Sequence, residues 1–166
     1  VNGQLLSPSI LGHNEDLEPY PYDPEQAKQL IEEAGVAGQT ITLVGESSGR
    51  WLNDRELVEA VASYWTEAGL KVDLQTPEFG AYLDVLFDRE NRADAIFVSS
   101  SNDLLDPSRQ LNTYYAMDGV GSSNSNQELH DLVKLGQATL DPDERETIYN
   151  QAVQIAYDEA YFAFLV

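Results

Sequence analysis

The sequence contains no cysteine among its 166 residues. Disulfide bonds, thiol chemistry and metal sites built on thiolates are therefore excluded. Only two histidines are present, His13 in an irregular segment and His130 in a helical one, so a zinc site is not expected either. We expect the chain to work without a metal or another cofactor.

Basic residues are scarce. Nine lysines and arginines stand against 29 aspartates and glutamates, which gives a formal net charge of −20. A field of this sign repels phosphate backbones and anionic lipids, so nucleic acid and membrane surfaces are disfavoured as partners. The acids are spread along the chain rather than massed in one block, which favours a role in solubility.

Long apolar runs are also missing, and none approaches the roughly 20 residues that a membrane span requires. No basic-then-apolar leader opens the sequence. The apolar run at residues 161–166 reads as a strand that stops in mid-pattern. We therefore expect that this chain was cut from a longer one.

Catalytic signatures are missing as well. No Gly-x-Ser-x-Gly elbow is present, so Ser99 to Ser101 together with His130 give only a weak indication of a hydrolase. Asp103 and Asp106 lack the spacing of a calcium-binding loop. A secreted hydrolase and an acidic, calcium-dependent interaction module remain as alternatives to a binding protein without catalysis.

The sequence does contain a regular alternation of helical and strand-like segments. Asp23 before Pro24, and Asp141 before Pro142, predict two helix starts, because aspartate caps free N–H groups and proline fits the first turn. Three strands are expected, near residues 39–46, 70–76 and 95–98. The strand–helix–strand order implies parallel pairing with right-handed crossovers.

The predicted fold is an α/β lobe in three layers. It has a mainly parallel β-α-β-α-β sheet, C-terminal helices and a final strand at residues 161–166. An extended segment is expected at residues 1–22 and a single lobe at residues 23–166, since this length suits one domain. A glycine-, serine- and asparagine-rich stretch at residues 119–126 is expected to be an exposed, mobile loop.

The candidate site follows the third strand. The apolar run Ala95–Val98 leads directly into a polar stretch, and in open α/β sheets ligands gather beyond the C-terminal ends of the strands. The candidate ligand-binding residues of this stretch are Ser100, Ser101, Asn102, Asp103 and Asp106. The alternative is that Asp106 merely opens the next helix and Asp103 is a solvated turn residue.

Trp51 is a sixth candidate. It lies in the polar loop after the first strand, whereas most other aromatic residues recur at helical spacing. Contact with a ligand and a simple covering role near a helix start are equally compatible with this position.

Four segments, in order, resemble the extracellular solute-binding proteins of family 5, the peptide- and nickel-binding receptors of ABC importers. Residues 20–35 (YPYDPEQAKQLIEEAG) resemble a Tyr-Asp-Pro-x-x-Ala-x-x-Leu-Leu-x-x-Ala-Gly segment, and residues 61–72 (VASYWTEAGLKV) a helix followed by a Gly-Ile-x-Val strand. Residues 103–107 (DLLDP) resemble the end of a Trp-x-x-Asp-x-x-Asp-Pro motif, and residues 141–149 (DPDERETIY) an Asp-x-x-x-Arg-x-x-x-Tyr segment. The resemblance covers nearly the whole chain.

This resemblance implies the C-terminal lobe of a two-lobed receptor that traps a small solute, first of all an oligopeptide, between its lobes. The expected partners are the permease subunits of an ABC importer. The expected location is extracellular or periplasmic, as a cell-surface lipoprotein in the full-length protein, and the fragment itself is expected to be monomeric.

The resemblance also assigns roles to residues. In the peptide binders the aspartate at the position of Asp103 meets the α-ammonium group of the ligand, a charge-assisted hydrogen bond of the stronger class. The family's tryptophan falls at Ser100, and a common aspartate falls at His130. A sugar, an opine or another polar ligand therefore remains an alternative to a peptide.

Overall fold

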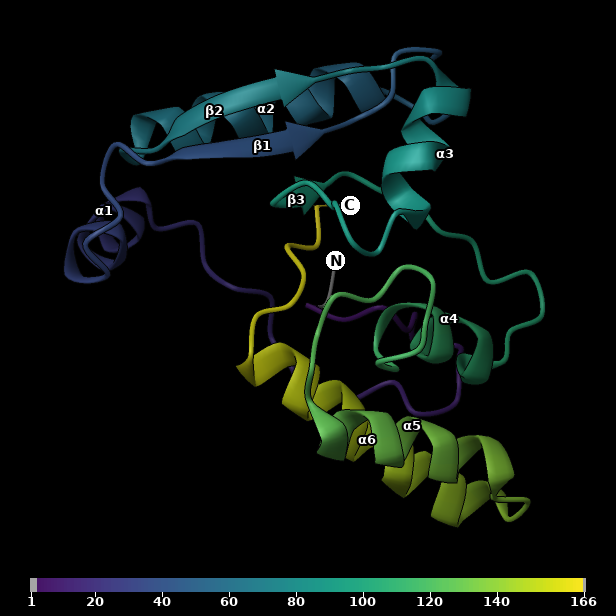
Figure 1. Ribbon diagram of the computed structural model, residues 1–166. Coiled ribbons are helices and arrows are strands. Elements are labelled where there is room, and N and C mark those ends of the chain that lie inside the picture. The colour runs from purple at the N-terminus through teal and green to yellow at the C-terminus, as the bar shows by residue number, and fades with distance from the viewer. Residues whose placement is uncertain (1–2, 166) are drawn as a thin grey trace. The chain divides into compact units, whose positions relative to one another are not determined.

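The computed structural model describes residues 3–165, and the chain forms two compact units. The sheet unit comprises Tyr22–Ser99. The helical unit comprises the described parts of Val1–Pro21 and Ser100–Val166. Figure 1 labels the elements of both units. The division into a segment 1–22 and a lobe 23–166 stays a prediction.

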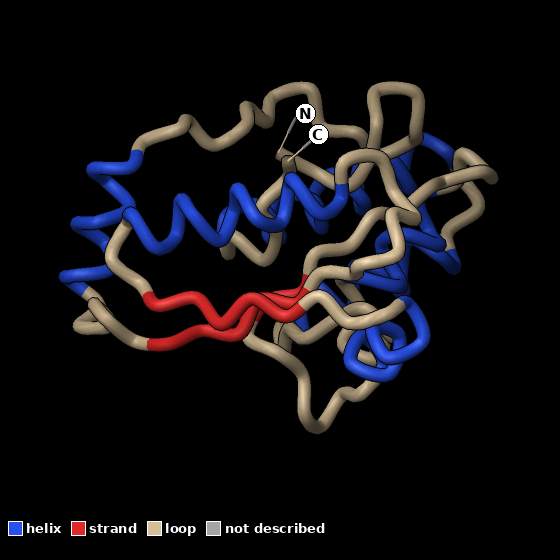
Figure 2. Tube along the Cα trace, turned by 90° about the horizontal axis from the view of Figure 1, so that it is seen from above, coloured by secondary structure: helices blue, strands red, loops and turns tan. Residues whose placement is uncertain are grey.

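The sheet unit contains three parallel strands in the order β2-β1-β3. Figure 2 draws the strands in red. Their bounds are Thr40–Val44 for β1, Lys71–Gln75 for β2 and Ala95–Ile96 for β3. The predicted parallel pairing is confirmed. β3 is shorter than expected and only half-buried. On its N-terminal side the Asp94 carboxylate accepts the Thr42 N–H of β1 at 2.7 Å, in place of a ladder bond.

Three helices complete the sheet unit and give the predicted β-α-β-α-β order. They are α1 (Pro24–Glu33), α2 (Asp54–Glu67) and α3 (Phe79–Phe87). Asp23 caps α1 as predicted, since its Oδ1 accepts the Gln26 N–H at 2.9 Å. Helix α2 packs on β2 and buries Val58, whereas α1 buries none of its residues.

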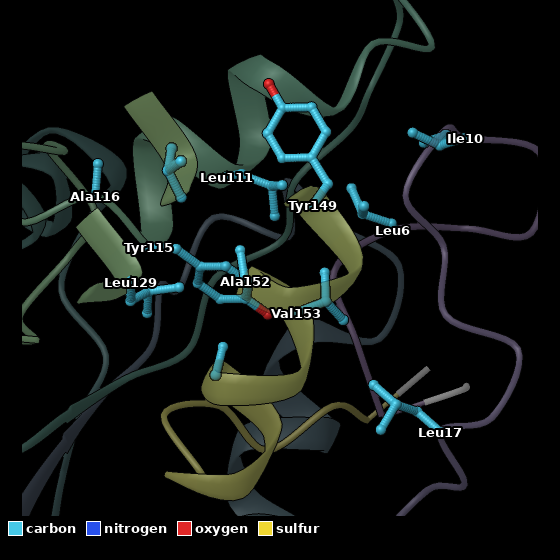
Figure 3. Packing of buried hydrophobic residues seen from close by; sticks show 12 residues of the cluster. Leu6, Ile10, Leu17, Leu111, Tyr115, Ala116, Leu129, Tyr149, Ala152 and Val153 are labelled. Atoms are coloured by element: carbon cyan, nitrogen blue, oxygen red, sulfur yellow. The ribbon is translucent and has the colours of Figure 1, made fainter. Parts of the chain in front are cut away.

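The helical unit contains α4 (Pro107–Tyr114), α5 (Gln127–Ala138) and α6 (Pro142–Asp158). Its core joins the irregular N-terminal segment to the helices, and Figure 3 shows Leu6, Leu111 and Tyr149 gathered in it. Helices α5 and α6 approach closely at Gly136, where an added Cβ would lie 2.4 Å from Cε1 of Tyr149. This close approach requires glycine on α5.

The expected final strand is not formed. Residues 161–165 carry no strand, and Val166 lies outside the described residues. The ring of Phe162 packs against Tyr114 and Tyr115 instead, with centroids 5.9 and 5.7 Å apart. Aromatic packing within the helical unit therefore takes the place of sheet pairing.

The stretch at residues 119–126 is a loop, as predicted, but it is not simply exposed. Ser122 is buried, and Asn124 donates from Nδ2 to the Tyr115 carbonyl at 2.9 Å and to Ser122 Oγ at 2.8 Å. The Gly121 N–H donates to the Thr113 carbonyl at 3.0 Å. Side-chain amides thus attach the loop to the end of α4.

Candidate functional site

The sheet unit brings the C-terminal ends of two strands together. Val44 at the end of β1 pairs with Ile96 at the end of β3, and the Phe97 N–H continues this ladder to the Val44 carbonyl at 2.8 Å. The loop at residues 45–53 leaves β1 from this edge and carries Trp51. Trp51, a site residue predicted from the sequence, therefore lies beyond the C-terminal end of a parallel strand, as expected for α/β sheets.

This loop is built around the carboxylate of Glu46, which is fully buried. Its Oε1 accepts the Arg50 N–H at 2.8 Å, and its Oε2 accepts the Ser48 N–H at 2.7 Å and the Ser48 hydroxyl. Asp54, also buried, accepts the Trp51 N–H at 2.9 Å and the Arg55 N–H at 2.7 Å. The two acidic side chains together fix the loop backbone on both sides of Trp51.

The ionisation of Glu46 follows from these donors. Burial alone would raise the pKa of its carboxyl group, but hydrogen bonding with Asp54, with the Ser48 hydroxyl and with the backbone N–H groups of Arg50 and Ser48 lowers it to about 2. Glu46 is therefore a carboxylate at neutral pH. A buried anion of this kind is tolerated because its oxygens are paired with donors.

Trp51 is half-buried and packs edge-on against two rings of the sheet unit. Its ring centroid lies 5.8 Å from that of Tyr82 and 6.2 Å from that of Phe97. Tyr82 is itself held, because its hydroxyl donates to the Phe97 carbonyl at 2.9 Å. The Arg50 guanidinium lies over the Phe79 ring, 4.4 Å from its centroid. Trp51 thus belongs to an aromatic cluster that hydrogen bonds and ring contacts hold in place.

The polar stretch after β3 begins the second part of the helical unit. Ser100 and Ser101 are exposed, and Asn102 anchors the turn that follows. Its Nδ2 donates to the Asp106 carbonyl at 2.9 Å and to Gln110 Oε1 at 3.1 Å, and its carbonyl accepts the Leu105 N–H at 3.2 Å. Leu105 has a φ of 53°, a left-handed conformation that leucine rarely adopts.

Asp103 lies inside this anchored turn, between Asn102 and Leu105. It is exposed, and within residues 3–165 its carboxylate forms no hydrogen bond or ion pair. The neighbouring Leu104 and Leu105 side chains are exposed as well. The turn therefore presents one unneutralised carboxylate beside apolar surface.

Asp106 is used differently. Its Oδ1 accepts the Ser108 N–H at 2.8 Å and caps α4, as the structural alternative predicted. Arg145 of α6 donates from Nη2 to both carboxylate oxygens, at 3.0 and 2.9 Å. Burial acts to raise the pKa of Asp106, but the bonds from Ser108 and Arg145 outweigh it and hold that pKa below its usual value.

The sequence makes His130 and the serines a possible hydrolase pair, and the structure gives His130 another contact. His130 accepts the Met117 N–H at its Nδ1, at 3.1 Å, and serves the loop after α4. Among the described residues, no group of three or more histidine, aspartate or glutamate side chains is arranged to hold a metal ion.

Within the same part of the chain, no helix is both long and apolar enough to cross a membrane.

A shallow groove of about 510 Å³ lies along α5 and α6. It contains none of the six predicted site residues. Its lining is mixed: Glu128, Leu132, Thr147, Asn150, Gln151, Gln154 and Ile155.

Two residues that support the candidate loops are not among the candidates from the sequence. The strand pattern contains Glu46 only as its last residue, although an acid between Gly45 and two serines is a usable signal for an anion held by backbone N–H groups. Arg145 belongs to the Asp-x-x-x-Arg-x-x-x-Tyr segment, whose pattern assigns it no role. In the sheet unit Glu46 holds the loop that carries Trp51, and in the helical unit Arg145 contacts Asp106 at the end of the turn that carries Asp103.

Comparisons with known proteins agree with this architecture. The family described as bacterial extracellular solute-binding proteins, family 5, middle, matches residues 1–122. The dipeptide-binding protein of Escherichia coli is 31% identical over 164 residues. Heme-binding protein A of Haemophilus influenzae is 28% identical over 168 residues. These matches cover 94% and 93% of this chain but only 30% and 29% of the relatives.

Solved structures show the same fold. The ABC transporter-associated periplasmic binding protein DppA from Helicobacter pylori, in complex with the peptide STSA, superposes with a TM-score of 0.77 at 26% identity. The match covers 95% of this chain and 32% of that one. The expected α/β fold of a periplasmic-binding-protein lobe is thereby confirmed. With the family match extending over most of its length, the chain belongs to the bacterial extracellular solute-binding proteins of family 5.

Proposed function

We propose that this chain is a ligand-binding lobe of an ABC importer receptor and that it captures an oligopeptide. The observation that carries the proposal is the Asp103 carboxylate, which is exposed, unpaired within the described residues and held on an anchored turn. A carboxylate that no protein group neutralises is suited to a cationic group of a ligand.

A peptide supplies that cation as its α-ammonium group. The E. coli relative is a dipeptide-binding protein, and the H. pylori structure holds the peptide STSA, which supports a peptide for this chain too. Ser100 and Ser101, with exposed side chains, are proposed as hydrogen-bonding groups for the same ligand. Trp51 is proposed as an apolar contact, a role that its aromatic support suits. Ligand contacts by Asn102 and Asp106 stay predictions, because the Asn102 side-chain nitrogen and the Asp106 carboxylate already hold the turn.

The proposal extends to the setting of the protein. As a member of an extracellular family the receptor delivers its solute to permease subunits in the membrane, and a lipid anchor on the full-length protein keeps it at the cell surface. Residues 23–166 act as one lobe of that receptor, without catalysis.

The test is calorimetric titration of alanyl-alanine into the whole protein that carries this chain. Asp103→Asn removes one negative charge and keeps the shape of the side chain. We expect it to weaken binding by about 1.5–3 kcal/mol, or roughly 10- to 150-fold, because a charge-assisted hydrogen bond is lost.

Asp16→Asn is the matched control. Asp16 is exposed and lies in the same unit, and its carboxylate forms no hydrogen bond or ion pair within residues 3–165. Its substitution should leave affinity within about twofold of the parent. Equal affinity of the Asp103→Asn variant and the parent would refute the role of Asp103.

A further inference from the structure

Two of the four segments that resemble family 5 meet in the helical unit. Asp106 belongs to the DLLDP segment, and Arg145 and Tyr149 belong to the DPDERETIY segment on α6. The proposed function uses Asp103 of the first segment and nothing of the second. The contacts of Arg145 connect the two.

The Arg145 guanidinium holds three elements at once. Its Nη2 donates to Asp106, as described above, and to Ser108 Oγ at 2.5 Å. Its Nε donates to the Gly136 carbonyl of α5 at 3.0 Å. Ser108 Oγ also shares a hydrogen bond with the Tyr149 hydroxyl at 3.0 Å, and the Tyr149 ring lies 5.2 Å from Arg145 Cζ. The side chain of Arg145 is largely buried, with 19% exposed.

This network holds one end of the turn that contains Asp103. Asn102 holds the other end through Gln110, which is buried on α4. The residues between the two ends include Leu105 in its left-handed conformation, a strained conformation that persists only where the surroundings impose it. The anchors at Asn102 and Asp106 are the groups that impose it.

We propose that Arg145 is a positioning residue for ligand binding: through Asp106 it fixes the turn that presents the Asp103 carboxylate. This inference rests on the proposed function. The guanidinium is required because its planar fork donates from several N–H groups in fixed directions, whereas the ammonium of lysine is a compact charge on a flexible stem. Lysine keeps the charge beside Asp106 but cannot reproduce the bonds to Asp106, Ser108 and Gly136 together.

A double-mutant cycle tests whether Arg145 acts through Asp103. Alanyl-alanine is titrated into the whole protein with Arg145→Lys made alone and on the Asp103→Asn background. We expect Arg145→Lys to weaken binding about tenfold when Asp103 is present and less than about twofold when it is not, because residues in one network are not additive. Arg109→Lys is the matched control. Arg109 is an exposed arginine of α4 without a hydrogen bond or ion pair within residues 3–165. Its substitution should leave the affinity for alanyl-alanine unchanged on both backgrounds.

A second readout needs no ligand. Amide hydrogen exchange at Leu105, whose N–H donates to Asn102, should accelerate at least about tenfold in Arg145→Lys, while amides of β1 and β2 keep their protection. If Arg145→Lys does not fold, Asp106→Asn replaces it, since asparagine still caps α4 but loses the charge pair. Both measurements then apply to that variant.

The possible failures can be told apart. Unchanged exchange at Leu105, or equal losses of affinity on both backgrounds, overturns the positioning role of Arg145. Accelerated exchange together with unaltered dipeptide binding by Asp103→Asn overturns the proposed role of Asp103, and with it the proposal that Arg145 acts on binding through Asp103.

Discussion

At the scale of single residues, two acids of this chain show opposite uses of one chemical group. Glu46 is buried and surrounded by donors, whereas Asp103 is exposed and has no bonded partner within the described residues. A buried anion contributes to stability only while its hydrogen bonds are made. An exposed anion adds little to stability and stays available to a ligand. The first acid supports the fold, and the second is the candidate for recognition.

Glu46→Gln tests the structural role. We expect it to lower the free energy of unfolding at neutral pH by about 1–3 kcal/mol, because hydrogen bonds to a buried charge are replaced by weaker ones and an amide NH₂ faces N–H donors. Denaturant unfolding followed by circular dichroism measures the loss. Glu56→Gln, at an exposed position of α2, is the control and should stay within about 0.5 kcal/mol of the parent.

The pH dependence of stability gives a second test of the structural role of Glu46. The folded pKa of Glu46, about 2, lies below its ordinary value of 4.5. Its contribution to stability is therefore complete above pH 4.5 and is lost as the pH falls toward 2. The parent should lose more stability across this window than Glu46→Gln does. Parallel curves for the two proteins would contradict the assignment.

Three acidic residues show which roles of single residues can be predicted from the sequence. The capping role of Asp106 could be predicted, because an Asp-Pro pair before a helix has local causes. The sequence around Glu46 gives a signal for a bound anion, but its burial and its donors could not be predicted in detail, because the directions of the backbone N–H groups depend on the folded loop. Whether Asp103 contacts a ligand stays a prediction.

At the scale of elements, helix starts were predicted best. Asp141 accepts the Glu144 N–H at 3.0 Å and opens α6 as expected, because capping depends on neighbours in the sequence. The predicted strand at residues 161–166 was wrong for its described part, since an apolar run does not reveal which surface will cover it. The Phe162 ring packs against aromatic rings of the helical unit instead.

The contact between α5 and α6 gives a prediction at this scale. Gly136→Ala should destabilise the protein by about 1–3 kcal/mol, because the new methyl group would overlap the Tyr149 ring and overpacking strains a core. In helix α3, Gly80→Ala is the matched control, since nothing lies within 4 Å of its added Cβ. That substitution should be neutral or stabilise by up to about 1 kcal/mol. Chemical denaturation of both variants measures the difference, and an equal response of the two would contradict the close-packing argument.

At the scale of the whole molecule, the chain spans 30% of the length of its E. coli relative. The parallel pairing of its strands, its α/β class and its family could be predicted from the sequence, because repeated local patterns and four ordered segments pointed to them. The division into a sheet unit and a helical unit could not, since it depends on contacts between the N-terminal segment and helices more than 90 residues later, as between Asn14 and Gln154.

The length of the relatives leads to a prediction about binding. If the receptor closes two lobes on its ligand, the 166-residue chain alone should bind alanyl-alanine at least about 100-fold more weakly than the whole protein, because most of the contacts that exclude water are missing. Calorimetry on both samples under one buffer condition measures the ratio. Equal affinities would show that one lobe suffices and would contradict a binding mode that needs two.

The aromatic surroundings of Trp51 have a practical consequence. The sequence contains only one other tryptophan, Trp65 on α2. With Trp65→Phe in place, the ultraviolet emission of the protein would come from Trp51 alone, and its wavelength and intensity would report on the loop after β1. A built-in optical probe of the proposed recognition surface is thus available without any added label.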